Sequence, residues 1–282
     1  MKNVLITIKH FISELSQRNI GAYAGSISFF FLLSMIPILI LISIALPLIG
    51  FSDKEFISIL ISFVPQVVNA RVVAIVKEVF RLADSILPVT IITFLWSCAR
   101  GMLGLMYGLN SVYKVKDDRG YFHLRLLATF YMMLLILLFL IMLVLMVFGQ
   151  KIQALLLNFV PMFGNIFGQV LQFRYLIVFV AGITILSLIY KLVPYENQPL
   201  IEQVPGACFT VVSWIIFSKI FEFFSSITSY SLYYGSLAVL ILFMIWLYWC
   251  IYIILIGGFL NWYFRYIYRI GIYHLKKKHR KS

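Results

Sequence analysis

The chain has 282 residues, of which 63% are hydrophobic and only 12% are charged, and its mean hydropathy is +1.01. A soluble domain carries about twice that share of charged residues. This composition excludes a water-soluble enzyme built around one large core. It predicts an all-α, polytopic membrane protein.

Six apolar runs are each long enough to cross a bilayer, and they occupy residues 27–50, 86–109, 126–149, 175–193, 204–224 and 236–260. About 20 residues at a rise of ~1.5 Å cover the ~30 Å hydrocarbon layer. Helices are expected because backbone groups in that layer have no water to bind, and no run alternates with strand period. We therefore predict one integral membrane domain over residues 1–282, with six transmembrane helices.

The distribution of Lys and Arg predicts the orientation. Fifteen of them lie in the N-terminal segment, the second and fourth connections and the C-terminal tail, against six in the other connections. By the positive-inside rule, both termini are expected in the cytoplasm, which agrees with an even number of spans.

The formal net charge of +13 reflects this asymmetry together with a basic tail at residues 265–282. The tail follows a membrane span and an expected aromatic girdle of Trp262, Tyr263, Tyr266 and Tyr268. Attraction to anionic lipid contributes ~1 kcal/mol per basic residue near a membrane surface. The expected partners are therefore the phospholipid bilayer and its anionic lipids, not nucleic acid, while self-association into a homo-oligomer stays open.

The metal-binding residue types are scattered. Cys98, Cys208 and Cys250 all lie inside predicted spans, so the sequence indicates neither a disulfide framework nor a metal cluster. The four histidines lie outside the spans and far apart in sequence. We expect no metal and no cofactor.

The first external connection, residues 51–85, is long and carries two segments of amphipathic pattern, Asp53–Val64 and Pro65–Ala83. Two interpretations fit this pattern. The segments are either helices lying on the bilayer surface or a cap over a central cavity.

Proline is expected to break or begin several spans. Pro37 and Pro47 lie inside the first, Pro88 begins the second, and Pro205 with Gly206 begins the fifth. A proline inside a membrane helix frees a carbonyl, which a neighbour such as Ser34 can bind. Discontinuous helices form the midplane site of many transporters, but kinks also occur in purely structural bundles, and both interpretations stay open.

Arg100 lies deep in the second span, where an ionised group costs at least ~2.5 kcal/mol, so it should face protein, water or an anion. Ser97, Gly101, Gly104 and Gly108 form a stripe of small residues that allows a second backbone to approach closely. Arg100 either caps buried carbonyls and locks the bundle, or binds an anionic ligand or lipid headgroup.

The remaining charges inside spans are Lys219 and Glu222, which can pair at i, i+3 near the external end of the fifth span. No carboxylate lies near mid-depth. This weakens a proton relay or a sodium site as the function, because such mechanisms usually need one.

Four strings together resemble the YihY/BrkB family of bacterial inner-membrane proteins. They are AYAGSISFFFLLSMIPILILI at 22–42, WSCARGMLGLMYGLNSVY at 96–113, YKLVPYENQPLIEQVPGA at 190–207 and YYGSLAVLILFMIWLYWCIYIILIGGFLN at 233–261. The resemblance covers nearly the whole chain and implies a location in the bacterial cytoplasmic membrane. The positions that match the family's recurrent residues are Ser34, Pro37, Trp96, Asn110, Pro205, Gly206, Tyr234, Gly235, Trp246, Gly257 and Asn261.

One departure from the family pattern affects mechanism. The family usually ends its last span with Gly-Ala-Glu, an aliphatic residue and Asn, whereas this chain has Phe259 in place of the acid. A mechanism that rests on that carboxylate is therefore in doubt here.

The resemblance implies little about chemistry, because the family's role is not settled and its older ribonuclease BN label is considered a misassignment. The residues agree with rejecting that label. Hydrolysis of RNA at a metal needs clustered His and Asp ligands, and the one local group, Asp117, Asp118 and His123, lies in a short basic loop that we interpret as solvated.

Three functions are weighed. The first is a transporter or permease-like protein with a central site for an anionic solute or lipid. Its ligand-binding candidates are Arg100, Ser97, Asn110, Ser34 and Tyr234. Its helix-break and packing candidates are Pro37, Pro205, Gly206, Gly104, Gly108, Gly235 and Gly257. The second is a non-transporting protein that binds lipid or a partner and supports envelope integrity. The third, an enzyme, has no nucleophile–base pair or metal spacing to support it, so no catalytic residue is assigned.

Overall fold

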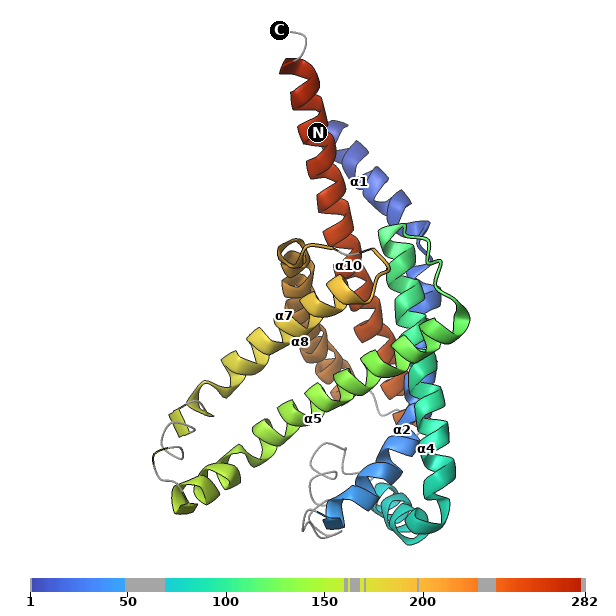
Figure 1. Cartoon of the computed structure of the whole chain (residues 1–282), viewed down its shortest axis with the longest axis vertical. Helices are drawn as coiled ribbons and strands as arrows, with labels where there is room; N and C mark the ends of the chain where they lie inside the picture. The colour runs from blue at the N-terminus through green and yellow to red at the C-terminus, as the bar shows by residue number, and fades with distance from the viewer. Residues whose placement is uncertain are drawn as a thin grey trace. The chain divides into compact units, whose positions relative to one another are not determined.

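The computed structural model describes residues 2–48, 69–159, 162, 168–169, 171–196, 198–227 and 237–279. The elements are α1 (Lys2–Ser16), α2 (Ile20–Leu48), α4 (Asn69–Tyr113), α5 (Tyr121–Phe159), α7 (Arg174–Leu192), the 3-10 turn η2 (Leu200–Gln203), α8 (Val204–Ile227) and α10 (Leu237–His279) (Figure 1). Over these ranges the prediction of an all-α fold is confirmed.

Five helical stretches in the described residues are long and apolar enough to cross a membrane: Leu87–Tyr113, Tyr121–Met142, Arg174–Leu192, Leu200–Phe223 and Leu240–Arg265. They correspond to the second to sixth predicted spans. In α2, a 29-residue helix, the corresponding apolar stretch among the fully described residues runs over Ile20–Met35. The coarse prediction of a multi-pass helical protein is confirmed, and the count of six is not shown.

Helix α4 differs from the sequence prediction. A break was expected at Pro88, between a surface helix and the second span, but α4 runs unbroken through Pro88 over 45 residues, or about 68 Å. A proline removes one backbone donor from a helix, and neighbouring groups can compensate for that loss inside a membrane protein. Helix α2 likewise continues through Pro37. The segment Asp53–Val64 lies outside the described residues.

The chain divides into two compact units, which we describe separately. The first comprises residues 1–20, 106–216 and 253–282, and the second comprises residues 21–105 and 217–252. The prediction of a single membrane domain stays a prediction.

In the second unit, α2 packs closely against the small-residue stripe of α4. A Cβ added at Gly101 would lie 2.6 Å from Cε1 of Phe31, and one added at Gly104 would lie 2.8 Å from Cγ1 of Ile27. A larger side chain at either position would push α2 away. The small residues of α4 therefore set the distance between these two helices.

In the first unit, α8 and α10 cross with their backbones in contact. A Cβ added at Gly257 would lie 2.8 Å from the carbonyl oxygen of Gly206, and one added at Gly206 would lie 2.6 Å from Cγ of Asn261. Pro205 occupies the first turn of α8, where its missing N–H costs no helical hydrogen bond. Gly206 and Gly257 thus form the crossing point.

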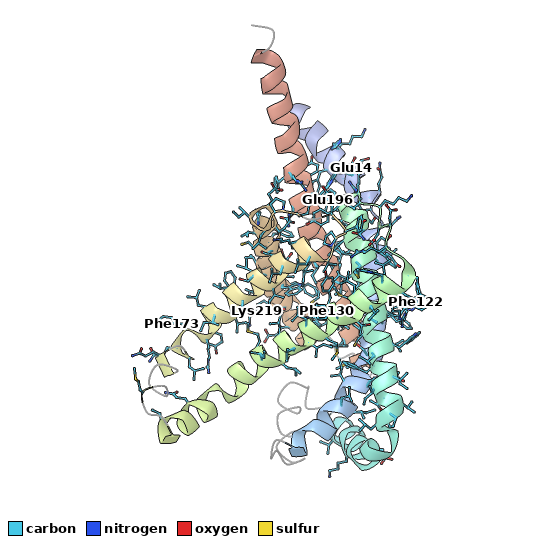
Figure 2. All side chains as sticks on the ribbon, in the orientation of Figure 1. Glu14, Phe122, Phe130, Phe173, Glu196 and Lys219 are labelled. Carbon is cyan, nitrogen blue, oxygen red and sulfur yellow. The ribbon has the colours of Figure 1, made fainter. Side chains whose placement is uncertain are left out.

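Helix α5, also in the first unit, presents apolar side chains to its surroundings. Phe122, Leu126 and Phe130 are 83%, 75% and 62% exposed (Figure 2). In the membrane-spanning window of α5 only 18% of the residues are buried, against 56% in that of α4. A helix that is apolar on its exposed side is suited to contact with lipid.

Candidate functional site

Arg100 lies at the centre of the longest apolar stretch of α4. It is 13 residues from Leu87 and 13 residues from Tyr113, so each end of the stretch is about 20 Å away along the helix. Its side chain is exposed. An Arg side chain extends toward water by no more than about one or two helical turns, so water 20 Å away is beyond its reach.

Five exposed side chains on one side of α4 form what we call the Arg100 face. They are Val89, Ile92, Thr93, Trp96 and Arg100, and helix positions three, four or seven residues apart lie on the same side. All five belong to the second unit. The Arg100 face therefore consists of one cation, one hydroxyl group and three apolar side chains.

The guanidinium of Arg100 lies beside one aromatic ring, which a second ring contacts. Its Cζ lies 5.8 Å from the ring centroid of Trp96, which Phe30 of α2 contacts edge-on at 6.1 Å. Within the described residues, Arg100 makes no hydrogen bond and no ion pair. The sequence-based alternative in which Arg100 caps carbonyls therefore finds no carbonyl partner in that part of the chain.

Two other predicted ligand-binding residues lie away from the Arg100 face. Ser97 and Ser34 are 1% and 2% exposed, and the Ser34 hydroxyl donates to the Phe31 carbonyl at 2.8 Å. That carbonyl is not the one that Pro37 frees, because a proline at position 37 removes the bond to Leu33. Tyr234 and Gly235 lie outside the described residues.

Asn110, the fifth predicted ligand-binding residue, holds two loops of the first unit together. Its Nδ2 donates to Oδ2 of Asp117 at 2.9 Å, and its Oδ1 accepts from the backbone N–H of Tyr195 at 2.9 Å. The amide of Asn110 thus joins the loop before α5 to the loop after α7. Gly108, two residues earlier in α4, is buried.

Asp117 is a structural anchor in a loop that is otherwise largely exposed. Its side chain is 6% exposed, and Arg119 donates to both carboxylate oxygens, at 2.8 Å from Nε and 2.6 Å from Nη2. These hydrogen bonds from Arg119, with the one from Asn110, outweigh desolvation and lower the pKa of Asp117. Asp118, the next residue, is exposed.

A buried chain of polar contacts supports the crossing of α8 and α10. The Tyr190 hydroxyl of α7 lies 2.7 Å from the Ile254 carbonyl and 2.8 Å from Oγ1 of Thr210. Asn261 accepts from the Gly206 N–H at 2.7 Å and donates to the Gln203 carbonyl at 3.1 Å. Asn261 therefore satisfies backbone groups at the first turn of α8, where a helix has no partners of its own.

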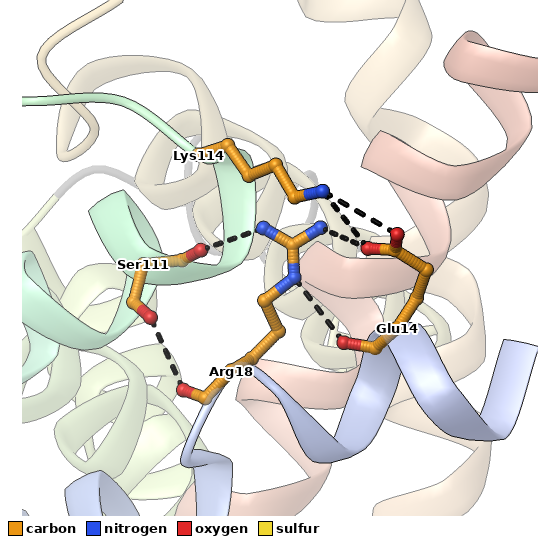
Figure 3. Close-up of polar contacts among 4 residues, drawn as sticks. All are labelled: Glu14, Arg18, Ser111 and Lys114. Carbon is orange, nitrogen blue, oxygen red and sulfur yellow. Dashed lines mark hydrogen bonds and ion pairs between the residues drawn. The ribbon is translucent and has the colours of Figure 1, made fainter.

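Sequence reasoning missed a second cluster, at the junction of α1 and α4 (Figure 3). Arg18 is only 3% exposed, and its Nη2 donates to Oε2 of Glu14 at 2.8 Å while Nη1 donates to the Ser111 carbonyl at 3.0 Å. Lys114 pairs with the same carboxylate at 3.1 Å. The spacing of Glu14 and Arg18, i and i+4 on a helix, was the available signal.

Trp262 and Tyr263, two residues of the expected aromatic girdle, lie at this junction. The Arg18 guanidinium lies 4.2 Å from the Trp262 ring centroid. Phe11 of α1 packs edge-on against Tyr263 at 5.0 Å and against Phe259 at 5.1 Å. Phe259, where the family pattern has an acid, is thus a fully buried contact between α1 and α10.

The comparisons with known proteins give one family match and one curated relative. The model of the virulence factor BrkB family matches residues 11–281. The chain is 27% identical over 256 residues to the ribonuclease-like protein YfkH of Bacillus subtilis (strain 168), a match that covers 90% of this chain and 93% of the relative. No solved structure matches the chain. With a family match over nearly its full length and a multi-pass helical fold, this chain belongs to the virulence factor BrkB family.

Proposed function

We propose that this protein is a membrane transport protein in which Arg100 binds the anionic group of the transported solute or lipid. The observation that carries the proposal is an exposed guanidinium at the middle of a membrane-spanning stretch, with no acid or carbonyl bound to it in the described residues. An unneutralised Arg at this depth costs at least ~2.5 kcal/mol. An anion that binds there offsets this cost.

The surroundings of Arg100 support a binding role more than a packing role. Trp96 lies beside the guanidinium, and in the part of the chain that the structure describes no protein group accepts a hydrogen bond from it. An Arg guanidinium offers five donors in a fixed planar fork, which suits carboxylate and phosphate groups. Arg100 is therefore equipped to recognise an anion by geometry as well as by charge.

A non-transporting role in lipid or partner binding is the second candidate. It is favoured by the described polar side chains of the first unit, because Asn110, Asn261 and Tyr190 all form hydrogen bonds with other parts of the same unit. A unit held together in this way is suited to a static membrane anchor. This candidate predicts anion binding without flux.

We do not extend the ribonuclease-like description of the Bacillus relative to this chain. In the described residues, no three His, Cys, Asp or Glu side chains come together as metal ligands would. Asp117, the acid of the short basic loop, is engaged by Arg119 and Asn110. We propose that the protein is not an enzyme.

The proposal is tested by anion efflux from proteoliposomes loaded in turn with chloride, phosphate and acetate. The variants are Arg100→Gln, Arg100→Lys and, as a matched control, Lys219→Gln, whose side chain is 78% exposed and pairs with Glu222 at 3.0 Å. We expect the wild type to move at least one of these anions or the lipid probe described below. This movement should fall about tenfold or more in Arg100→Gln, recover partly in Arg100→Lys and stay unchanged in Lys219→Gln.

Two results would overturn the transport proposal. One is efflux no faster than from protein-free vesicles for all three anions and for the lipid probe described below. The other is efflux that is equal in wild type and Arg100→Gln, because the anion would then bypass Arg100.

We also propose that the protein resides in a bacterial cytoplasmic membrane with both termini in the cytoplasm. The Lys and Arg asymmetry and the family support this orientation. It places the Asn110 and Arg18 clusters on the cytoplasmic side. Self-association and binding of anionic lipid by the basic tail belong to the same proposal.

A further inference from the structure

The Arg100 face is charged at one end and largely apolar along the rest, which limits the kinds of anion that can bind to it. On the Leu87 side of Arg100, the other side chains of this face are Trp96, Thr93, Ile92 and Val89, which extend over 11 residues, or about 17 Å. Three of these four side chains are apolar. The face thus presents one cation at mid-depth and an apolar strip that runs from it toward one membrane surface.

A small inorganic anion fits this face poorly. Such an ion needs several polar groups around it to replace its water, and the face offers only one hydroxyl besides Arg100. That hydroxyl, on Thr93, is seven residues from Arg100, or about 10 Å along the helix. The two groups are too far apart to share one small ion.

A second copy of the chain also fits poorly. Two copies inserted with the same orientation and joined by their Arg100 faces would bring their Arg100 side chains together at the same depth. Two like charges close together in a medium of low dielectric constant repel strongly. The charge of the face therefore favours a negatively charged occupant.

We propose that the Arg100 face binds an amphiphilic anion, with its acidic headgroup at Arg100 and its apolar chain along Trp96, Ile92 and Val89. This inference rests on the proposed function in placing an anion at Arg100, and it names the class of that anion. The headgroup makes charge-assisted hydrogen bonds to the guanidinium. The chain covers apolar surface of 69% exposed Ile92 and 67% exposed Val89.

The occupant would lie with its headgroup at the level of the hydrocarbon core. Ordinary bilayer lipids keep their headgroups at the surface, so a lipid in this position is partway across the membrane. Arg100 would lower the energy of that intermediate position. The Arg100 face would therefore act as a path for lipid movement between leaflets, not as a permanent lipid seat.

The experiment is native mass spectrometry of the full chain in nanodiscs made of equal parts phosphatidylglycerol and phosphatidylcholine. Besides the wild type, it uses Arg100→Gln, which removes the cation, and Ile92→Gln, which interrupts the apolar strip. The control is Leu126→Gln on α5, a 75% exposed apolar residue outside the face. We expect phosphatidylglycerol to be retained preferentially by the wild type and by Leu126→Gln, and retention to fall about tenfold in Arg100→Gln and severalfold in Ile92→Gln.

The outcomes separate this inference from the transport proposal. If all four proteins retain the two lipids equally while small-anion efflux depends on Arg100, the lipid inference is wrong and transport stands. If retention depends on Arg100 and Ile92 but neither the small anions nor a fluorescent phosphatidylglycerol crosses the vesicle membrane, the site stands and transport fails. Co-purification of an acidic membrane partner that disappears in Arg100→Gln, without lipid retention, would also overturn the inference.

Discussion

At the junction of α1 and α4, the ion pair between Glu14 and Arg18 compensates a buried charge. Arg18 is almost completely buried, and the Glu14 carboxylate neutralises it while Lys114 pairs with the same group from a half-exposed position. Burial raises the pKa of Glu14, but the hydrogen bonds and charges of Lys114 and Arg18 outweigh it and lower that pKa overall. A buried charge that loses its partner is costly, whereas an exposed pair contributes little.

This contrast predicts unequal effects of two substitutions. Glu14→Gln leaves Arg18 buried without its counter-charge and should lower the free energy of unfolding by about 3 kcal/mol. Lys114→Gln removes a side chain that is 52% exposed and should change it by less than about 1 kcal/mol. Unfolding by dodecyl sulfate titration in mixed micelles measures both, and equal losses would show that burial of Arg18 does not set the cost.

The lowered pKa of Asp117 predicts how the stability of the protein changes with pH. Its pKa is lowered below the ordinary value of 3.8, so its contribution to stability is complete above that value and is lost as pH falls through the folded-state pKa. The stability difference between wild type and Asp117→Asn should therefore be constant at neutral pH and shrink below pH 3.8. Asp118→Asn, at an exposed position, should change stability by less than about 0.5 kcal/mol at neutral pH. A difference that grows on acidification would contradict this account of Asp117.

At the scale of elements, two glycines decide how α8 and α10 cross. A methyl group at Gly206 or Gly257 would meet backbone and buried side-chain atoms that have no room to move, and overpacking of this kind costs ~1–3 kcal/mol or more. Gly206→Ala and Gly257→Ala should each lower the thermal stability of the detergent-solubilised protein.

Gly25 is the matched control for these glycines. It lies in α2, and a Cβ added there has nothing within 4 Å. Gly25→Ala should leave stability unchanged or raise it by up to ~1 kcal/mol, since alanine is the better helix former. The crossing geometry would be wrong if Gly206→Ala were as mild as Gly25→Ala.

The elements also show where prediction from sequence ended. Apolar length predicted the membrane-spanning stretches of α4, α5, α7, α8 and α10, because the bilayer sets a length that composition alone reveals. Pro88 was expected to divide α4, but local propensity does not say whether neighbours compensate for one missing donor. The contacts of Phe259 with Phe11 and of Trp262 with Arg18 could not be predicted either, because they join residues that are distant along the chain.

The candidate site could be predicted only in part. A charged residue in an apolar run costs free energy in the membrane, and this cost alone indicates a function. Arg100 could therefore be identified as a candidate from the sequence. The roles of Asn110 and Asp117 could not be seen there, because their partners lie on loops that are distant along the chain. Tyr195, for example, is 85 residues away from Asn110.

For the whole molecule, the charge asymmetry predicts a topology that labelling can test. In a chain whose three cysteines are replaced by alanine, Lys77→Cys should react with an impermeant maleimide added outside intact cells, and Asp118→Cys should react only after the membrane is opened. Both positions are exposed. The opposite pattern would invert the orientation of every helix.

The measurement that tests the central claim most directly is the accessibility of position 100 itself. In the same cysteine-free background, Arg100→Cys is treated with a small anionic, water-soluble thiol reagent in open membranes. Ala99→Cys, 1% exposed, is the buried control and Asp118→Cys the exposed one. If Arg100 provides a mid-membrane site for an anion, Arg100→Cys will be modified and Ala99→Cys will not. An unmodified Arg100→Cys beside a fully modified Asp118→Cys would show that a water-soluble anion does not reach position 100 and would contradict the account.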